Sequence, residues 1–116
     1  MKQKYILPKL KSWEWGYIAG MLDGEGWIGF QQDRKHKRPT IVISGTNKEA
    51  MEWINKKLNN TEKFIRVEMT KWKGKQAKPI YRVRMRNKEV FEKVLKKLLP
   101  YLIVKKDKAT ICLKQL

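Results

Sequence analysis

The sequence predicts an α+β domain in which one four-stranded antiparallel sheet is packed under helices. Two pairs of stretches alternate between apolar and polar residues, as half-buried strands do, and each pair is followed by a stretch with helical periodicity. The expected order is helix, strand, strand, helix, strand, strand, helix, helix. Strand pairs separated by a helix favour an antiparallel sheet. Because 116 residues with 41% hydrophobic content can bury one core, we expect a single domain over residues 1–116.

The first helix is expected over residues 12–23. Ser12 can cap its N-terminus, and Glu14 in the first turn has the charge that this end of a helix favours. Gly24 and Gly26 follow the last apolar residues, and together they predict where the helix stops.

A hairpin is expected after this helix. In residues 27–35, Ile28 and Phe30 would face the core, whereas the residues between and after them would face away from it. Residues 34–39 are expected to form a polar turn, and residues 40–45 the second strand.

The second half of the chain has the same pattern, although its sequence is not a repeat of the first half. Thr46 and Glu49 have the spacing of a capping box and predict a helix that continues to residue 58. Residues 63–72 and 80–86 alternate as a second pair of strands.

Two helices are expected to close the chain. Asn87 can cap the first of them, over residues 88–99, which should end near Pro100. Residues 104–116 predict the second.

The strongest property of the whole chain is its charge. Lys and Arg number 28 against 11 Asp and Glu, which gives a net charge of +17. Such a field attracts a polyanion, and nucleic acid is the first candidate. A lysine-rich solubilising surface is the alternative. A membrane partner is disfavoured, because no segment is a clean basic amphipathic helix and no apolar run approaches the ~20 residues that span a bilayer.

The cysteine and histidine content indicates where the protein acts and which metal sites it can have. The one cysteine, Cys112, cannot form an intrachain disulfide, and the first residues lack the apolar core of a signal peptide. We therefore expect an intracellular protein that is not secreted, either cytoplasmic, nucleoid-associated or organellar. The one histidine, His36, lies in the polar turn, and a structural zinc site is excluded.

The polar face of the sheet is the candidate surface for nucleic acid. If Tyr81 and Val83 meet the core, the arginines between and after them stand on the open face. Arg, Gln, Ser and Thr side chains can hydrogen-bond to base edges, and a β-ribbon fits the major groove of DNA. An ordinary solvated face is the alternative. The candidate contacts are Trp27, Gly29, Gln31, Asp33, Lys35, Arg38, Thr40, Ser44, Arg66, Glu68, Thr70, Arg82, Arg84 and Arg86.

The first helix carries small residues that another helix could approach closely. Gly16 and Gly20 are four residues apart, and each glycine costs ~1 kcal/mol relative to alanine inside a helix. A buried helix that merely tolerates them is the alternative. If a second copy packs here, the candidate dimer interface is Gly16, Tyr17, Gly20 and Met21.

Glu25 follows the helix C-terminus, where the orphan carbonyl groups are already partly negative. Two copies of the helix packed side by side would bring two such carboxylates together. They would repel each other without an oxygen-seeking cation such as Mg²⁺. This residue is therefore a candidate for half of a shared metal site, and a plain helix stop is the alternative.

Residues 18–26, IAGMLDGEG, resemble the nonapeptide of the LAGLIDADG homing endonucleases, with identities at Ala19, Gly20, Asp23 and Gly26. The predicted element order matches the αββαββα fold of that family, whose four-stranded sheet is saddle-shaped with helices on one face. Residues 100–113 are similar to the family's late segment, which carries an active-site lysine. The resemblance covers residues 12–113.

The resemblance implies roles for single residues. Glu25 stands where the family's metal-binding acid stands, with a backbone carbonyl near Gly24 beside it, and Asp23 would have a structural role. The active-site lysine falls on Lys105, with Lys106 as the alternative register. Asn47 matches a polar residue that holds the water network. The chain departs from some members at Met51, where they have a basic residue.

The implied activity is hydrolysis of both strands of double-stranded DNA by a homodimer at a palindromic or near-palindromic site, leaving short 3′ overhangs. The implied cofactor is Mg²⁺, or Mn²⁺, with Ca²⁺ in non-cleaving complexes, and the implied biological context is the mobility of an intron or intein. A relative that binds DNA or intron RNA without cutting is the alternative. Retention of Glu25 and Lys105 favours the enzyme.

Overall fold

The expected fold is present in a computed structural model, which describes residues 4–63, 65–68 and 78–116. The expected order of helices and strands is confirmed, including the last helix. The elements are α1 (Ser12–Glu25), β1 (Gly26–Asp33), β2 (His36–Gly45), α2 (Lys48–Lys57), β3 (Ile65–Val67), β4 (Ile80–Met85), α3 (Lys88–Leu98), the 3-10 helix η1 (Leu99–Tyr101) and α4 (Lys106–Lys114).

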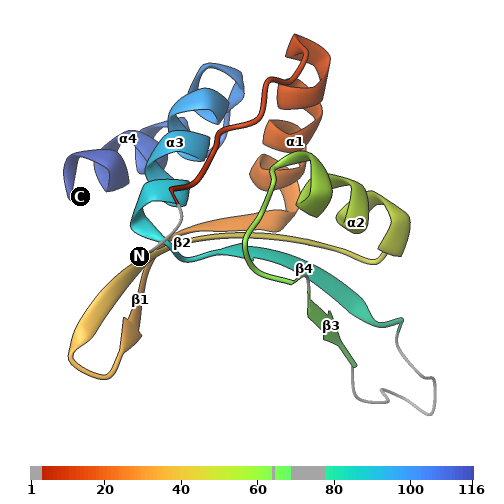
Figure 1. Ribbon diagram of the computed structural model, residues 1–116, viewed down its shortest axis with the longest axis horizontal. Helices are drawn as coiled ribbons and strands as arrows, with labels where there is room; N and C mark the ends of the chain where they lie inside the picture. Colours follow the sequence, from red (N-terminus) through yellow and green to blue (C-terminus); the bar gives the residue numbers. More distant parts are fainter. Residues whose placement is uncertain (1–3, 64, 69–77) are drawn as a thin grey trace.

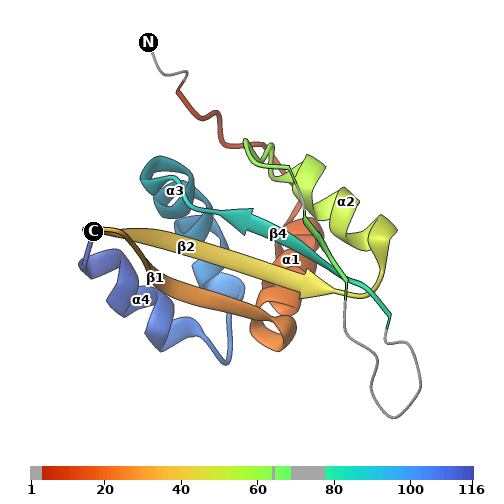
Figure 2. The same cartoon turned by 90° about the horizontal axis from the view of Figure 1, so that it is seen from below.

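The four strands form one antiparallel sheet in the order β1-β2-β4-β3. Figure 1 shows the helices on one side of this sheet, which bends away from them toward both of its ends. The other face is therefore open and concave, and Figure 2 shows it from below, with the helices behind the strands.

The core lies between the sheet and the helices. The inward-facing residues of the strands are those that the alternation predicts, and Ile28, Ile41 and Val83 are fully buried. Helices α1 and α3 supply the opposite side of the core, and the rings of Phe91 and Phe30 lie 6.2 Å apart between α3 and β1. Burying one face of the sheet in this way leaves the polar face without a covering helix in the part of the chain that the structure describes.

The ends of α1 differ from the sequence prediction. The N-cap is Lys11, not Ser12, and the Lys11 N–H donates to the Glu14 carboxylate at 2.9 Å. The helix also continues through Gly24 to Glu25 and stops at Gly26. A Cβ on Gly26 would lie 2.7 Å from the carbonyl oxygen of Leu22, so this glycine allows the strand to leave the helix closely.

Two other boundaries differ as well. Asn47, not Thr46, caps α2, and its Oδ1 accepts from the Ala50 N–H at 2.9 Å. The first hairpin turn is shorter than residues 34–39, because β2 begins at His36, opposite Asp33. Arg34 lies in this turn with a φ of 57°, in the left-handed region that residues other than glycine rarely adopt.

The segment before α1 is hydrogen-bonded to α3 and to the end of α2. The Tyr5 hydroxyl donates to the carbonyl of Leu58 at the end of α2, and the Tyr5 N–H donates to Glu89 on α3. Burial raises the pKa of Tyr5 to about 12. Lys93 donates to the Tyr5 carbonyl at 3.1 Å, so one residue joins α2 and α3. Among the described residues, no helix has the length and apolar character needed to cross a membrane.

Candidate functional site

The nonapeptide forms the C-terminal half of α1 and the turn into β1. Glu25 is the last residue of the helix and is exposed, and Gly24 before it is also exposed. Glu25 lines a hollow in the open face of the sheet together with Trp27, Gln31, Ser44, Arg82 and Arg84. The motif therefore delivers one carboxylate to the border between α1 and the polar sheet face.

Asp23 fastens the late segment of the chain to the end of α1. Its carboxylate accepts from the Ile103 N–H at 2.7 Å and from the Lys105 N–H at 3.0 Å. Burial acts to raise the pKa of Asp23, but the backbone N–H groups and the Lys105 charge outweigh it, so the pKa lies below its ordinary value. These contacts give Asp23 the structural role that the resemblance implies.

Lys105 is the lysine that faces the motif. Its Nζ donates to the carbonyl oxygen of Asp23 at 2.6 Å, in the last turn of α1. That turn has no basic residue of its own, so Lys105 supplies the positive charge that a helix C-terminus favours. Lys106, the alternative register, is the exposed first residue of α4. Lys105, and not Lys106, therefore contacts the motif.

We expect Asp23→Ala to destabilise the fold by about 1–2 kcal/mol at neutral pH, because it removes two charge-assisted hydrogen bonds from a partly exposed carboxylate. Since the folded-state pKa of Asp23 is lowered, this stability is present above the unfolded pKa of ~3.9 and is lost as the pH falls through the folded value. Denaturant unfolding of both proteins at pH 7 and pH 3, at one protein concentration, measures the difference.

The control is Asp107→Ala, which removes an exposed acid from the first turn of α4. Its effect should be smaller than that of Asp23→Ala at pH 7. Equal effects of the two substitutions, or a loss at Asp23 that is the same at both pH values, would contradict the claim that the Asp23 carboxylate holds the late segment of the chain.

The acids near the end of α1 do not form a cluster of protein metal ligands in the part of the chain that the structure describes. Within residues 4–63, 65–68 and 78–116, no group of three or more His, Cys, Asp or Glu side chains could hold an ion. The donors at the end of α1 are nevertheless oxygens, the Glu25 carboxylate and the orphan carbonyls of the last turn, and such donors suit Mg²⁺. A site that two copies complete fits these residues.

One face of α1 lacks a partner within the described chain. A Cβ built on Gly20 or Gly24 would meet nothing within 4 Å, so packing inside this molecule does not require either glycine. Tyr17 is 44% exposed on the same face, with its ring edge against Trp53 of α2. Of the other interface candidates, Gly16 is partly buried and Met21 packs against Gly45.

Exposed apolar side chains that were not among the interface candidates also lie beside α1. Trp13 stacks on Trp53 and is 62% exposed. Ile103 and Val104, in the loop that Asp23 holds, are 86% and 75% exposed. Large apolar side chains gathered around one helix face mark an interaction surface more often than a free one.

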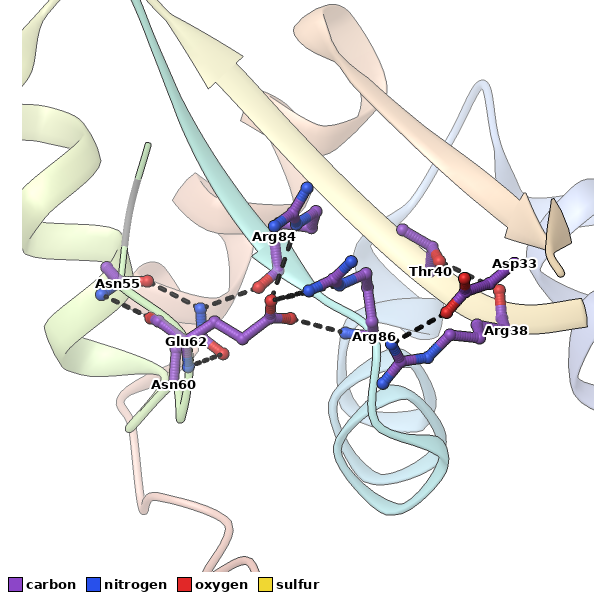
Figure 3. Close-up of polar contacts among 8 residues, drawn as sticks. All are labelled: Asp33, Arg38, Thr40, Asn55, Asn60, Glu62, Arg84 and Arg86. Atoms are coloured by element: carbon purple, nitrogen blue, oxygen red, sulfur yellow. Dashed lines mark hydrogen bonds and ion pairs between the residues drawn. The ribbon is translucent and has the colours of Figure 1, made fainter. Parts of the chain in front are cut away.

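Most of the predicted sheet-face residues do lie on the open face. The register pairs Gln31 with Arg38, and Ser44 with Arg82. Lys35 lies exposed at the tip of the hairpin. Arg38 forms an ion pair with Asp33 at 3.5 Å, which Figure 3 shows at the β1–β2 end of the sheet.

Two residues expected to be accessible on this face, Gly29 and Thr40, are buried. The Trp27 indole lies over Gly29, where a Cβ would come within 2.7 Å of the ring, and it covers that position. Thr40, paired with Gly29, is fully buried, and its hydroxyl donates to the Arg38 carbonyl at 3.0 Å. The expected exposure of Gly29 and Thr40 is therefore wrong, and at Gly29 the cause is the Trp27 ring on the same strand.

The face assigned to β3 is also wrong. Residues paired across an antiparallel ladder point to the same side, and Ile65 pairs with Arg82, whereas Arg66 pairs with the inward-facing Tyr81. Arg66 therefore lies on the side opposite to Arg82, and it forms an ion pair at 2.6 Å with Glu68. Thr70, the last candidate on this stretch, lies outside the described residues.

Asn47 and Met51 line a second hollow, which also contains Glu25. The cap at Ala50 occupies Oδ1 of Asn47. Met51 is fully buried, with its terminal methyl near Gly45, so the position where some relatives carry a basic residue belongs to the core of this chain.

Two charged residues at the site were not among the candidates. Glu62, in the loop after α2, forms ion pairs with Arg84 of β4 and with Arg86 just beyond that strand. Lys108 of α4 lies 5.3 Å from the centre of the Trp27 ring. No sequence spacing relates these residues to their partners, because each pair joins elements that are distant along the chain.

The fold matches that of solved homing endonucleases. The homing endonuclease I-CvuI, in complex with the I-CreI target in 2 mM Mg with the DNA not cleaved, superimposes with a TM-score of 0.66. The same endonuclease with its own target, Sro1.3, in 2 mM Ca gives the same TM-score. The archaeal intron-encoded homing endonuclease I-Vdi141I, complexed with DNA, gives 0.63.

These structures define the fold class of the chain, which is the homing-endonuclease fold. Each of the three is 21% identical to this chain and covers 88% of it, whereas the chain spans only 64–65% of their length. At that identity the likeness shows the fold alone. No protein-family model and no curated protein matches the sequence.

Proposed function

We propose that the chain is a divalent-metal-dependent DNA endonuclease that acts as a homodimer on a palindromic or near-palindromic site. The observation that carries this proposal is the position of Glu25. It is the exposed last residue of α1, between the open glycine face of that helix and the open polar face of the sheet.

The sheet is the proposed DNA-binding surface. Its concave face carries Arg82, Arg84 and Gln31, whose side chains can contact base edges or phosphates along the major groove. The excess of lysine would neutralise phosphates and make binding depend strongly on salt. Similar structures with this fold are complexes with DNA, which supports the same partner here.

The dimer is proposed to form through α1. Gly20 and Gly24 leave room for a second helix backbone, and the exposed Trp13, Tyr17 and Ile103 surround that space with apolar surface. A two-fold axis beside α1 would place the Glu25 side chains of both copies near each other. The same symmetry requires a DNA site made of two inverted halves.

The proposed metal ligands are the Glu25 carboxylate and the carbonyl near Gly24 from each copy. Mg²⁺ or Mn²⁺ bound there would activate water and neutralise the scissile phosphate, whereas Ca²⁺ would support binding without cutting. Lys105, held at the end of α1, would place its positive charge where the phosphate becomes more negative. Asn47, in the hollow that contains Glu25, would orient water through its amide.

Binding of duplex DNA at increasing salt concentration tests this function first. The folded dimer should bind a pool of random duplexes, lose affinity steeply with salt, and select one class of inverted-repeat sites from the pool. Binding of an inverted repeat without cleavage in Mg²⁺ or Mn²⁺ would support the non-cleaving alternative. A protein that binds single-stranded RNA better than duplex DNA would overturn the proposal.

A further inference from the structure

The three arginines of the β4 stretch differ in what holds them. β4 ends at Met85, so Arg86 lies beyond the strand and not within it as residues 80–86 predicted. The side chain of Arg86 is 30% exposed, that of Arg84 is 31% exposed, and Arg82 is exposed. Figure 3 shows Arg84 and Arg86 converging on one acid, Glu62.

Arg86 is held by that acid through three hydrogen bonds. Its Nε and Nη2 donate to Glu62 Oε1 at 3.1 and 2.9 Å, and its backbone N–H donates to Oε2 at 3.1 Å. This forked contact turns the guanidinium toward the loop after α2. The contact therefore competes with any use of Arg86 on DNA.

Arg84 is held by the same acid in a different way. Its Nε lies 3.6 Å from Glu62 Oε1, at ion-pair but not hydrogen-bond distance, and this nitrogen is buried without a hydrogen-bond partner. The Nη groups have no hydrogen bond within the described residues. Arg84 thus lies with one edge against the carboxylate, and its terminal fork remains available to a ligand in the hollow that Gln31 and Ser44 line.

Glu62 is itself fixed in place. The Asn60 amide donates to Asn55 at 2.7 Å and to the Arg84 carbonyl at 3.0 Å, which ties the loop to β4. Asn55 donates to the Glu62 carbonyl at 3.4 Å. Figure 3 shows these amides and Glu62 as one continuous network beside the strand. These bonds hold the backbone of Glu62 beside the strand, and from there its carboxylate reaches both arginines.

We propose that Glu62 is a positioning residue that presents Arg84 as the base-reading arginine of this strand and withholds Arg86 from the DNA. The two Nη groups of Arg84 match the O6 and N7 acceptors of guanine. Arg82, exposed and without an ion pair among the described residues, is left for phosphate. This inference rests on the proposed DNA-binding function and adds to it the residue that sets base preference.

The test is Glu62→Gln, which keeps the shape of the side chain but removes its charge and places an amide against the guanidinium groups. Binding should be profiled on single-base variants of the selected site, without cleavage. We expect discrimination to fall by about tenfold at one symmetric pair of positions. Affinity for random duplex should stay equal or rise, because one negative charge is lost.

Two further variants separate positioning from general damage. Arg84→Lys should flatten the same pair of positions, and the double substitution with Glu62→Gln should add little, because both act on one contact. Glu92→Gln, which breaks an exposed pair with Lys96 on α3, makes the same charge change on the helical side and should leave the profile unchanged. Thermal unfolding of each variant checks that the fold is intact.

The inference is overturned if a folded Glu62→Gln protein keeps the wild-type preference profile, or if it weakens all sequences alike. It is also overturned if Arg86→Ala, and not Arg84→Lys, flattens the profile. In those cases the wild-type protein still selects a site, so the proposed function stands. A wild-type protein with no site preference would overturn both.

Discussion

Glu25→Gln is expected to reduce DNA cleavage by about 10³-fold or more and to leave DNA binding intact. The amide keeps the shape of the exposed side chain at the end of α1 but loses the charge that a divalent cation needs, and loss of metal catalysis costs several kcal/mol of barrier. Binding without metal should be equal or tighter, since two carboxylates facing phosphate repel it. Cleavage rate and dissociation constant, measured on one duplex, test both parts.

The matched control is again Glu92→Gln, which removes an acid of the same type from the helical side. It should cut at the wild-type rate. Wild-type nicking by Glu25→Gln would remove this residue from the metal site. Equal loss of binding and of cleavage would mean that Glu25 acts in folding or in docking, not in chemistry.

Gly20→Leu is expected to raise the dissociation constant of the dimer by about 30-fold or more. The added side chain enters open space in the single chain, so the folded monomer should accept it. In the dimer it would lie between two helix backbones, where overpacking costs about 1–3 kcal/mol at each of the two copies. Sedimentation over a range of concentrations measures the change.

Gly20→Ala is a control that should stabilise the folded monomer and weaken the dimer at the same time. Alanine favours a helix interior by ~1 kcal/mol over glycine, and outside α1 itself no described residue lies within 4 Å of the added methyl. Unfolding of the monomer should therefore become harder while association becomes weaker. An unchanged dimer with Gly20→Leu would place the interface away from this face of α1.

Much of the fold could be predicted because its signals are local. Alternation at Ile41, Ile43 and Val83 identified the buried side of the central strands, where one whole face meets the helices. Asn87 was correctly identified as the cap of α3, since its oxygen reaches the next N–H groups along the chain. Such patterns need only the neighbours in sequence.

The β3 assignment failed because that strand is short and at an edge. Ile65, Arg66 and Val67 alternate, but both apolar residues are only partly buried, so alternation did not reveal which side faces the core. The register with β4 decides it, and a shift of one residue reverses every side chain. Gly29 was misjudged for another reason, because only the folded strand shows the Trp27 ring above it.

The parts of the site that sequence could not reach are contacts between distant elements. Nothing in the spacing of Glu62 and Arg86 indicates that the loop after α2 contacts the end of β4. The link from Asp23 to Ile103 spans 80 residues. This link also explains how Lys105 reaches the motif. The resemblance implied a lysine near the motif but did not identify the contact that brings it there.

The most direct test of the account is selection of cleaved sites from a randomised duplex library with Mg²⁺, followed by sequencing of both ends of each break. We expect breaks in both strands, short 3′ overhangs, and a preferred site whose two halves are inverted repeats, all absent when EDTA replaces Mg²⁺. A folded, dimeric protein that yields no double-strand breaks, or breaks unrelated to any inverted repeat, would contradict the claim that two copies of α1 build one nuclease site.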